Sequence, residues 1–179
     1  MKRFPYISQA VVCLLLVLID QLTKIVARDY LKENPVSVID GVFSLHYLEN
    51  RGSIWGILQG KVDVLLVGSL LIFMFLVYVY VKMPKEVFYL PLFWIFTIMG
   101  AGAIGNTIDR IFFGFVTDFL YFELMDFPIF NVADCYLTVC SFLLIFLAFT
   151  KYKEDNFTFL SLRRKDVSND AADANADEN

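Results

Sequence analysis

Two aspartates in the second half of the chain have the residue type and surroundings to carry chemistry. Asp118 lies in the segment FVTDFL, between aromatic and aliphatic neighbours, where no structural role accounts for a carboxylate. Asp134 lies three residues after Asn131, in NVAD, so capping of a helix N-terminus would already account for it. Pro128 lies between the two aspartates and can turn the chain back, which would bring the carboxylates together.

Two carboxylates in contact cannot comfortably both ionise, so such a pair shares one proton near neutral pH. The pair can hydrolyse a peptide bond: the ionised member takes a proton from water, and the protonated member donates to the carbonyl oxygen. Because a helix N-terminus favours negative charge, we expect Asp134 to be the base and Asp118 the acid. A proton-coupled carrier would use the same two acids, so the pair alone leaves a hydrolase and a carrier open.

The composition predicts a membrane protein. The chain has 179 residues, of which 58% are hydrophobic and 17% aromatic, and its mean hydropathy is +0.62. A soluble domain of this length cannot remove so much apolar surface from water. The acidic residues concentrate at 166–179, and without them the charge is near balance, so no nucleic-acid partner is indicated. Cys13, Cys135 and Cys140 show neither a disulfide framework nor metal-ligand spacing, and we expect no metal or cofactor.

Four stretches have the roughly 20 apolar residues that a helix needs to cross a bilayer. They cover residues 7–27, 62–81, 87–108 and 133–152. No small-residue cleavage site follows the first stretch, so we expect a retained helix rather than a signal peptide. Basic residues lie before the first span, between the second and third, and after the fourth: Lys2, Arg3, Lys82, Lys85, Lys151 and Lys153. This alternation predicts that both termini are cytoplasmic.

The chain is predicted to divide into two parts. Residues 1–153 would form a four-helix membrane domain, and residues 154–179 an acidic cytoplasmic tail. The end of the tail is rich in Asp, Asn and Ala, a composition that cannot form an apolar core, so we expect disorder.

The first outer loop, about residues 35–60, has its own pattern. Val36 and Val38 alternate with polar residues before Asp40-Gly41, and a second alternating run follows with Phe43 and Leu45. Asp-Gly between alternating runs predicts a β-hairpin. The expected fold is therefore a four-helix α-helical membrane protein with a small extracytoplasmic sheet. The sheet would form a cradle on the membrane surface for a ligand that is half lipid and half peptide; the alternative is a simple covering loop.

Charged residues inside the predicted spans have helical spacing. Asp20 and Lys24 are four residues apart and share a helix face, so we expect an ion pair that orients the first helix. Asn106, Asp109 and Arg110 share a face of the third span, and we expect a buried salt bridge between Asp109 and Arg110.

The distribution of polar residues favours a site over a passage. A carrier needs polar groups through the whole membrane depth, but here the second span has Ser69 as its main polar residue, and the charges gather in the outer half. A purely structural membrane protein would not need a carboxylate such as Asp118. Gly100, Gly102 and Gly105 leave little bulk on the third span, which would allow close approach of another helix or of substrate.

Five motifs resemble those of bacterial lipoprotein signal peptidase, signal peptidase II. They are DQLTK at 20–24, ENRGSIWG at 49–56, GNTIDR at 105–110, GFVTDF at 114–119 and FNVAD at 130–134. They occur in the order found in that family and span nearly the whole membrane portion. Each motif alone is weak, but the ordered set on four spans is specific.

The resemblance implies an aspartic endopeptidase of the bacterial inner membrane. It would remove the signal peptide from a prolipoprotein, cutting before a cysteine that carries diacylglycerol, and globomycin would inhibit it. The family's catalytic pair falls on Asp118 and Asp134. The residues that contact substrate or support the site fall on Asn50, Gly52, Asn106, Arg110, Asn131, Asp20, Lys24 and Asp109. The partners implied are the lipid-modified substrate and membrane lipid, and nothing demands a second subunit, so we expect a monomer.

One motif departs from the family pattern. The family usually has two alanines and an aromatic residue where this chain has Ser53, Ile54 and Trp55. The extra bulk of Ile54 would reshape the pocket beside the scissile bond and so bear on substrate preference. Both catalytic aspartates are present, so the departure does not affect the expected activity.

Overall fold

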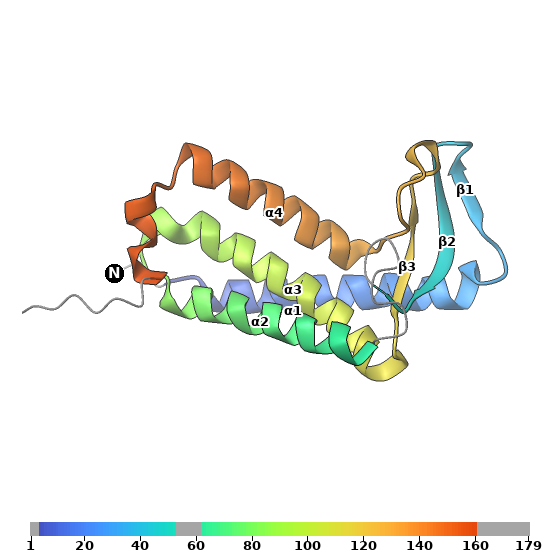
Figure 1. Cartoon of the computed structure of the whole chain (residues 1–179), viewed down its shortest axis with the longest axis horizontal. Coiled ribbons are helices and arrows are strands. Elements are labelled where there is room, and N and C mark those ends of the chain that lie inside the picture. Colours follow the sequence, from blue (N-terminus) through green and yellow to red (C-terminus); the bar gives the residue numbers. More distant parts are fainter. Residues whose placement is uncertain (1–3, 53–61, 161–179) are drawn as a thin grey trace, which may run out of the picture.

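Long helices lie side by side and lead to a small sheet at one end of the molecule (Figure 1). This computed structural model describes residues 4–52 and 62–160. Within those ranges, four helical segments are long and apolar enough to cross a membrane. They are α1 (Tyr6–Val26, continued by the π-helix η1, Ala27–Leu31), α2 (Val62–Lys82), α3 (Leu90–Phe113) and α4 (Val132–Thr150). The predicted fold class is confirmed.

Helix α3 is the centre of the bundle and packs against each of the other three helices. It follows a 3-10 turn, η3 (Val87–Tyr89), and it extends beyond the predicted end at residue 108 to Phe113. Most of its residues are buried, whereas α2 and α4 keep large apolar side chains exposed on their outer sides, for example Phe75 and Phe149. Such exposed apolar faces are what lipid contact requires.

Two glycines of α3 allow close packing. A Cβ atom at Gly102 would lie 2.7 Å from the Ala133 carbonyl oxygen, so α4 can approach only because that position has no side chain. A Cβ atom at Gly105 would overlap the Asp20 carboxylate of α1. The prediction of close approach is therefore confirmed at these two positions. At Gly100 a Cβ atom would meet nothing within 4 Å, and the prediction does not hold there.

The sheet has three antiparallel strands in the order β1-β2-β3. β1 (Val36–Ile39) and β2 (Phe43–Asn50) form the predicted hairpin, and Gly41 in its turn has φ 69°. β3 (Val116–Tyr121) was not predicted; Asp118 was expected in a connection and instead lies on this strand. Gly114 ends α3 with φ 74°, a left-handed conformation that turns the chain from the helix directly into β3.

After β3 the chain turns back along the same strand. A short 3-10 helix, η4 (Glu123–Met125), begins the turn, and Phe130 then pairs with Leu120 in an antiparallel bridge. The bridge brings Asn131 and the start of α4 beside Asp118. The chain reverses at residues 122–127, before Pro128, and not at Pro128 as expected.

The other end of the bundle has an aromatic core and an ordered extension. Residues 154–160 form a 3-10 helix, η5 (Glu154–Leu160), whose apolar side chains pack on this core. The Tyr89 hydroxyl donates to the Asn156 carbonyl oxygen at 2.9 Å. The tail predicted to be disordered from residue 154 is therefore ordered as far as Leu160. The rest of that tail, 161–179, and the departing motif residues Ser53, Ile54 and Trp55 lie outside the described residues.

Candidate active site

Asp118 is almost fully buried on β3 and accepts two amide hydrogen bonds. Asn50 Nδ2, at the end of β2, donates to Asp118 Oδ2 at 2.8 Å, and Asn131 Nδ2 donates to Asp118 Oδ1 at 2.6 Å. The Gly52 backbone N–H donates to Asn50 Oδ1 at 3.0 Å. Because its oxygen is occupied by that donor, the Asn50 amide nitrogen faces the carboxylate.

Asp134 lies in the first turn of α4 and also accepts two hydrogen bonds. Asn106 Nδ2 donates to Asp134 Oδ1 at 2.7 Å, and the Asn131 backbone N–H donates to Asp134 Oδ2 at 3.2 Å. In return, Asn131 Oδ1 accepts from the Asp134 backbone N–H at 3.0 Å. The predicted cap is thus confirmed as a reciprocal capping box.

One residue joins the two carboxylates. Asn131 donates its side-chain amide to Asp118 and its backbone N–H to Asp134, and it is fully buried. Its amide also reaches Asn106 Oδ1 at 3.2 Å, so both carboxylates belong to a single amide network. The two aspartates singled out by their sequence surroundings are therefore neighbours in the fold.

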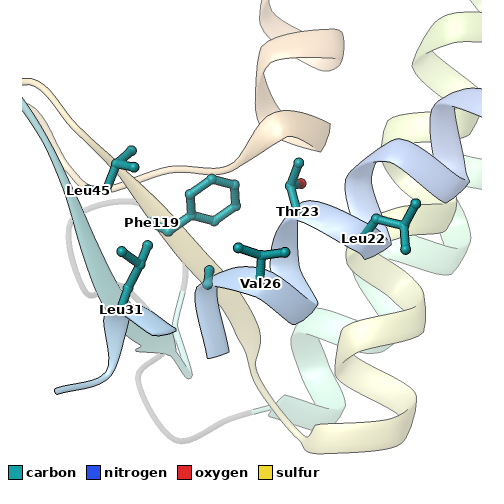
Figure 2. A pocket seen from close by; sticks show the side chains of 7 residues that line it. Leu22, Thr23, Val26, Leu31, Leu45 and Phe119 are labelled. Carbon is teal, nitrogen blue, oxygen red and sulfur yellow. The ribbon is translucent and has the colours of Figure 1, made fainter. Parts of the chain in front are cut away.

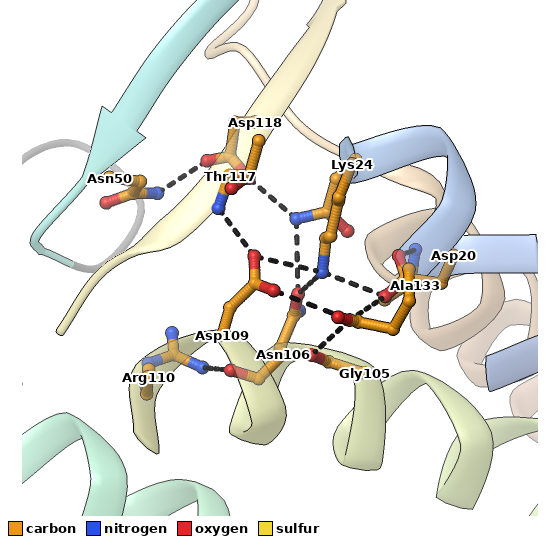
Figure 3. A network of polar contacts seen from close by, with 12 residues as sticks. Asp20, Lys24, Asn50, Gly105, Asn106, Asp109, Arg110, Thr117, Asp118 and Ala133 are labelled. Carbon is orange, nitrogen blue, oxygen red and sulfur yellow. Dashed lines mark hydrogen bonds and ion pairs between the residues drawn. The ribbon is translucent and has the colours of Figure 1, made fainter. Parts of the chain in front are cut away.

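A buried ammonium group lies behind this network (Figure 3). Lys24 Nζ is 2.9 Å from Asp20 Oδ2, 3.6 Å from Asp109 Oδ2 and 2.9 Å from Asn106 Oδ1, and the Lys24, Asp20 and Asp109 side chains have no exposed surface. The predicted pair of Asp20 and Lys24 is confirmed. Because Lys24 occupies the Asn106 oxygen, the amide nitrogen of Asn106 is turned toward Asp134.

The two supporting carboxylates each hold a backbone group next to a candidate catalytic residue. Asp20 Oδ1 accepts from the Ala133 N–H at 3.0 Å, directly before Asp134. Asp109 Oδ2 accepts from the Thr117 N–H at 2.8 Å, directly before Asp118. Asp20 and Asp109, both paired with Lys24, therefore fix the backbone next to Asp134 and Asp118. These contacts do not involve the carboxylates of Asp118 or Asp134.

The expected salt bridge between Asp109 and Arg110 is wrong. Asp109 faces Lys24 and Arg28 instead, because neighbouring residues on a helix point in different directions. Arg110 Nη1 donates to Ser69 Oγ of α2 at 3.2 Å and to the Asn106 carbonyl oxygen at 3.4 Å. The guanidinium thus lies between α2 and α3 at the edge of the network.

Sequence reasoning missed Gln21 as a member of the site. Its Nε2 lies 3.1 Å from Asp20 Oδ2, 3.1 Å from the Gly105 carbonyl oxygen and 3.4 Å from Asp109 Oδ1. The spacing carried a signal, since Gln21 precedes Lys24 by three residues and so lies on the same side of α1.

Arg28 and Thr117 were also missed. Arg28 Nη1, from η1, donates to Thr117 Oγ1 at 2.8 Å. No local pattern could have found this contact, because the two residues are 89 positions apart in sequence and meet only in the fold.

The surroundings of Asp118 favour its protonated form. Burial, followed by the nearby Asp134 carboxylate, raises the pKa of Asp118 to about 7. The hydrogen bonds from Asn50 and Asn131 and the charge of Lys24 act in the opposite direction. A carboxyl group with such a pKa can hold a proton near neutral pH and release it to a reacting oxygen.

An apolar groove lies on the other side of β3 (Figure 2). It measures about 270 Å³ and is lined by Leu22, Thr23, Val26, Ala27, Leu31, Leu45 and Phe119. Phe119 follows Asp118 on the strand, so the two side chains point to opposite faces and the groove does not contain the dyad. Across residues 4–52 and 62–160, no group of three or more His, Cys, Asp or Glu side chains is arranged to hold a metal.

Membrane-length helices with two amide-bridged carboxylates at one end define a multi-pass membrane protein with a carboxylate site suited to hydrolysis. The sequence pattern of one protease family, described as signal peptidase (SPase) II, matches residues 12–150. The chain belongs to the signal peptidase II family.

Individual relatives agree with this assignment. The lipoprotein signal peptidase of Caldicellulosiruptor bescii is 35% identical over 139 residues, which cover 78% of this chain and 89% of the relative. That of Streptococcus thermophilus is 41% identical over 127 residues, covering 68% and 76%. Two solved structures of bacterial membrane enzymes match with TM-scores of 0.69 and 0.70 at 32% and 30% identity, covering 82% and 81% of this chain and 93% and 94% of theirs. The protein is therefore a membrane-embedded protease of the family that removes signal peptides from lipoproteins.

Proposed function

We propose that the protein is an aspartic endopeptidase that cuts diacylglyceryl-modified prolipoproteins before the lipidated cysteine, with Asp118 and Asp134 as its catalytic pair. The observation that carries this proposal is the double contact of Asn131, which donates to both carboxylates. Two neighbouring carboxyl groups held this way have one proton to share, which is the requirement of acid–base hydrolysis without a covalent intermediate.

In the proposed reaction a water molecule lies between the carboxylates and the scissile carbonyl group. Asp134, in the first turn of α4, takes a proton from the water as the water oxygen attacks the carbonyl carbon. Asp118, protonated because its pKa is about 7, donates its proton to the carbonyl oxygen. Collapse of the tetrahedral intermediate returns a proton to the nitrogen and breaks the C–N bond, which leaves a carboxylate on the signal peptide and an amine on the cysteine.

The amides and the cluster around Lys24 would keep this geometry fixed through the reaction. Asn50, Asn106 and Asn131 donate to carboxylate oxygens and limit how far each carboxyl group can rotate. Arg110 remains available at the edge of the network for a substrate carbonyl. Site groups that need no rearrangement at the moment of reaction lower the barrier most.

We place the site at the outer face of a bacterial cytoplasmic membrane. Basic residues at the opposite end of the bundle, including Lys82, Lys85 and Lys151, support cytoplasmic termini. The sheet would then cover the outer surface beside the dyad, where a peptide and its attached lipid can both be reached. The proposed partners are the lipid-modified prolipoprotein and bilayer lipid, with the enzyme acting as a monomer.

The test uses purified full-length protein in detergent with a diacylglyceryl-modified prolipoprotein. Wild-type protein should release the signal peptide, and globomycin should block the release. Asp118→Asn and Asp134→Asn should each abolish cleavage, because an amide can neither donate a carboxyl proton nor accept one from water. Cleavage is followed by gel shift and by mass spectrometry of the new cysteine N-terminus.

Asp126→Asn is the matched control. Asp126 lies between the two aspartates in sequence but is exposed. Its side chain accepts from the Tyr121 hydroxyl, and its φ of 46° is one that asparagine tolerates. This variant should cut at the wild-type rate. Normal cleavage by a folded Asp118→Asn or Asp134→Asn protein would refute the catalytic pair.

A further inference from the structure

We propose that Arg28 is a positioning residue for Asp118, holding the catalytic strand from the side opposite the asparagine amides. The proposal rests on the catalytic role proposed above for Asp118. It concerns a residue that the family motifs do not include and that lies on η1, beyond the α-helical part of α1.

Three groups fix the Arg28 side chain. Its Nη1 donates to Thr117 Oγ1 at 2.8 Å and lies 3.8 Å from Asp109 Oδ1. Its guanidinium carbon lies 4.4 Å from the centre of the Phe113 ring, at the end of α3. Only 17% of the side chain is exposed. A planar guanidinium that bonds in its plane and stacks on an aromatic ring has little freedom left.

These contacts act on the residue directly before Asp118. Thr117 is fully buried, its N–H is held by Asp109 and its hydroxyl by Arg28, so both its backbone and its side chain are fixed. Asp109 itself lies between Lys24 and Arg28. Arg28 therefore links the end of α1 to α3 and β3 at the point where the catalytic carboxylate leaves the strand.

The rest of η1 supports the same face of β3. Thr117 and Phe119 alternate with Asp118, so their side chains share the face opposite the carboxylate. Phe119 packs with Ala27 and Leu31 in one buried cluster, and Figure 2 shows its ring directed toward the end of α1. η1 thus contacts the face of β3 opposite Asp118 in two ways. Arg28 donates a hydrogen bond to Thr117, and the apolar side chains of Ala27 and Leu31 pack on Phe119. π-turns are frequent at functional sites.

The expected consequence is kinetic. Without the contact between Arg28 and Thr117, strand β3 can shift. A displacement of about 1 Å at a catalytic group can lower turnover by about 100-fold. The amides of Asn50 and Asn131 still hold Asp118, so we expect a smaller loss, about tenfold in kcat. KM should change less than about twofold, because Arg28 acts on the reacting geometry rather than on substrate binding.

The experiment compares kcat and KM of purified Arg28→Met, Thr117→Val, Thr117→Ser and the Arg28→Met/Thr117→Val double variant. Arg28→Met and Thr117→Val each remove the hydrogen bond between the two side chains, and each should lower kcat by about tenfold. The double variant should be no slower than Arg28→Met, since both changes break the same interaction. Thr117→Ser keeps the hydroxyl and should return to within about twofold of wild type. Lys32→Met, which removes an exposed cation from the same segment, should leave kcat unchanged.

Several results would overturn the inference. These are wild-type kcat in Arg28→Met and Thr117→Val, independent effects that multiply in the double variant, or a Thr117→Ser protein as slow as Thr117→Val. If thermal unfolding shows that Arg28→Met does not fold, the comparison of Thr117→Val with Thr117→Ser decides alone. Failure of wild type to cut, or activity in Asp118→Asn, would instead refute the proposed function.

Discussion

The two ends of the helix bundle are built from the same four helices but by different means. The end away from the sheet has a core of large apolar side chains, including Leu92, Phe93 and Phe96, and the Tyr80 and Tyr152 rings. The end beside the sheet buries Asp20, Lys24, Asp109 and Asp118, with Asp134 partly buried next to them. One end is held by packing, and the other by a closed set of charges and amides.

The two ends should differ in how well they tolerate substitution. In an apolar core a lost contact costs its own packing energy and the neighbours can partly relax. In a buried ionic cluster the loss of one partner leaves the others uncompensated, so the penalty spreads to each group that depended on it. The site end therefore has a more rigid geometry but tolerates substitution less well than the apolar end.

Lys24→Met should give the largest effect. The substitution leaves Asp20 and Asp109 buried without their shared ammonium, and each of them anchors the backbone next to one of the two proposed catalytic residues. We expect destabilisation of about 3–5 kcal/mol and a fall in turnover of more than about 100-fold. Measurements are thermal unfolding in detergent and cleavage at a temperature where the variant is folded.

Lys85→Met is the matched control at the other end of the bundle. Lys85 is exposed and donates to the backbone carbonyl groups of Val81 and Met83. Turnover should remain at the wild-type level. Equal losses in the two methionine variants would remove the distinction between the two ends.

Turnover should next depend on pH through Asp118. Its pKa of about 7 means that the proton needed by the proposed acid is lost as the pH rises through 7. Above that value, kcat/KM should fall by about tenfold for each further pH unit. A profile from pH 5 to 9 at constant ionic strength checks this, with Asp126→Asn expected to give the same curve. A flat profile up to pH 9 would contradict the assignment of Asp118 as the acid.

Phe93→Ala should lower the stability of the protein but leave its turnover nearly unchanged. The Phe93 side chain is fully buried and its ring lies 4.5 Å from that of Phe4 and 5.0 Å from that of Tyr80. Truncation should lower the free energy of unfolding by about 3–5 kcal/mol. The kcat of the folded variant should remain within about twofold of wild type, because Phe93 belongs to the apolar cluster at the end of the bundle away from the sheet. A tenfold lower kcat in folded protein would show that the two ends are coupled.

Deletion of residues 166–179 should have the smallest effect. This acidic segment lies beyond all five family motifs, so the truncated protein should cut at the wild-type rate. Cleavage assays on full-length and truncated protein at equal concentration measure the difference. A large loss of turnover would show that the acidic segment takes part in catalysis or substrate capture.

The sequence was sufficient for those features that depend on local pattern. Continuous apolar length predicts the four helices, and Asp40-Gly41 between alternating residues predicts the hairpin. The pair of Asp20 and Lys24 follows from a four-residue spacing on one helix. In each case the residues that interact are near one another in the chain, so periodicity alone carries the information.

Features that depend on contacts distant in sequence were not predictable. Strand β3 exists because β2 supplies its partner, and its buried residues on both faces leave no clean alternation in VTDFLY. The contact of Arg28 with Thr117 has no local signal for the same reason. The expected pair of Asp109 and Arg110 failed because adjacency in sequence was mistaken for proximity on a helix.

The bridging position of Asn131 has a consequence for biosynthesis. β3 precedes the last membrane crossing, and Asn131 and Asp134 belong to the start of that crossing. A nascent chain with three inserted helices carries Asp118 but lacks its partner and the amide that joins the two. On the proposed mechanism, the carboxylate pair is complete only when the fourth helix has docked beside β3.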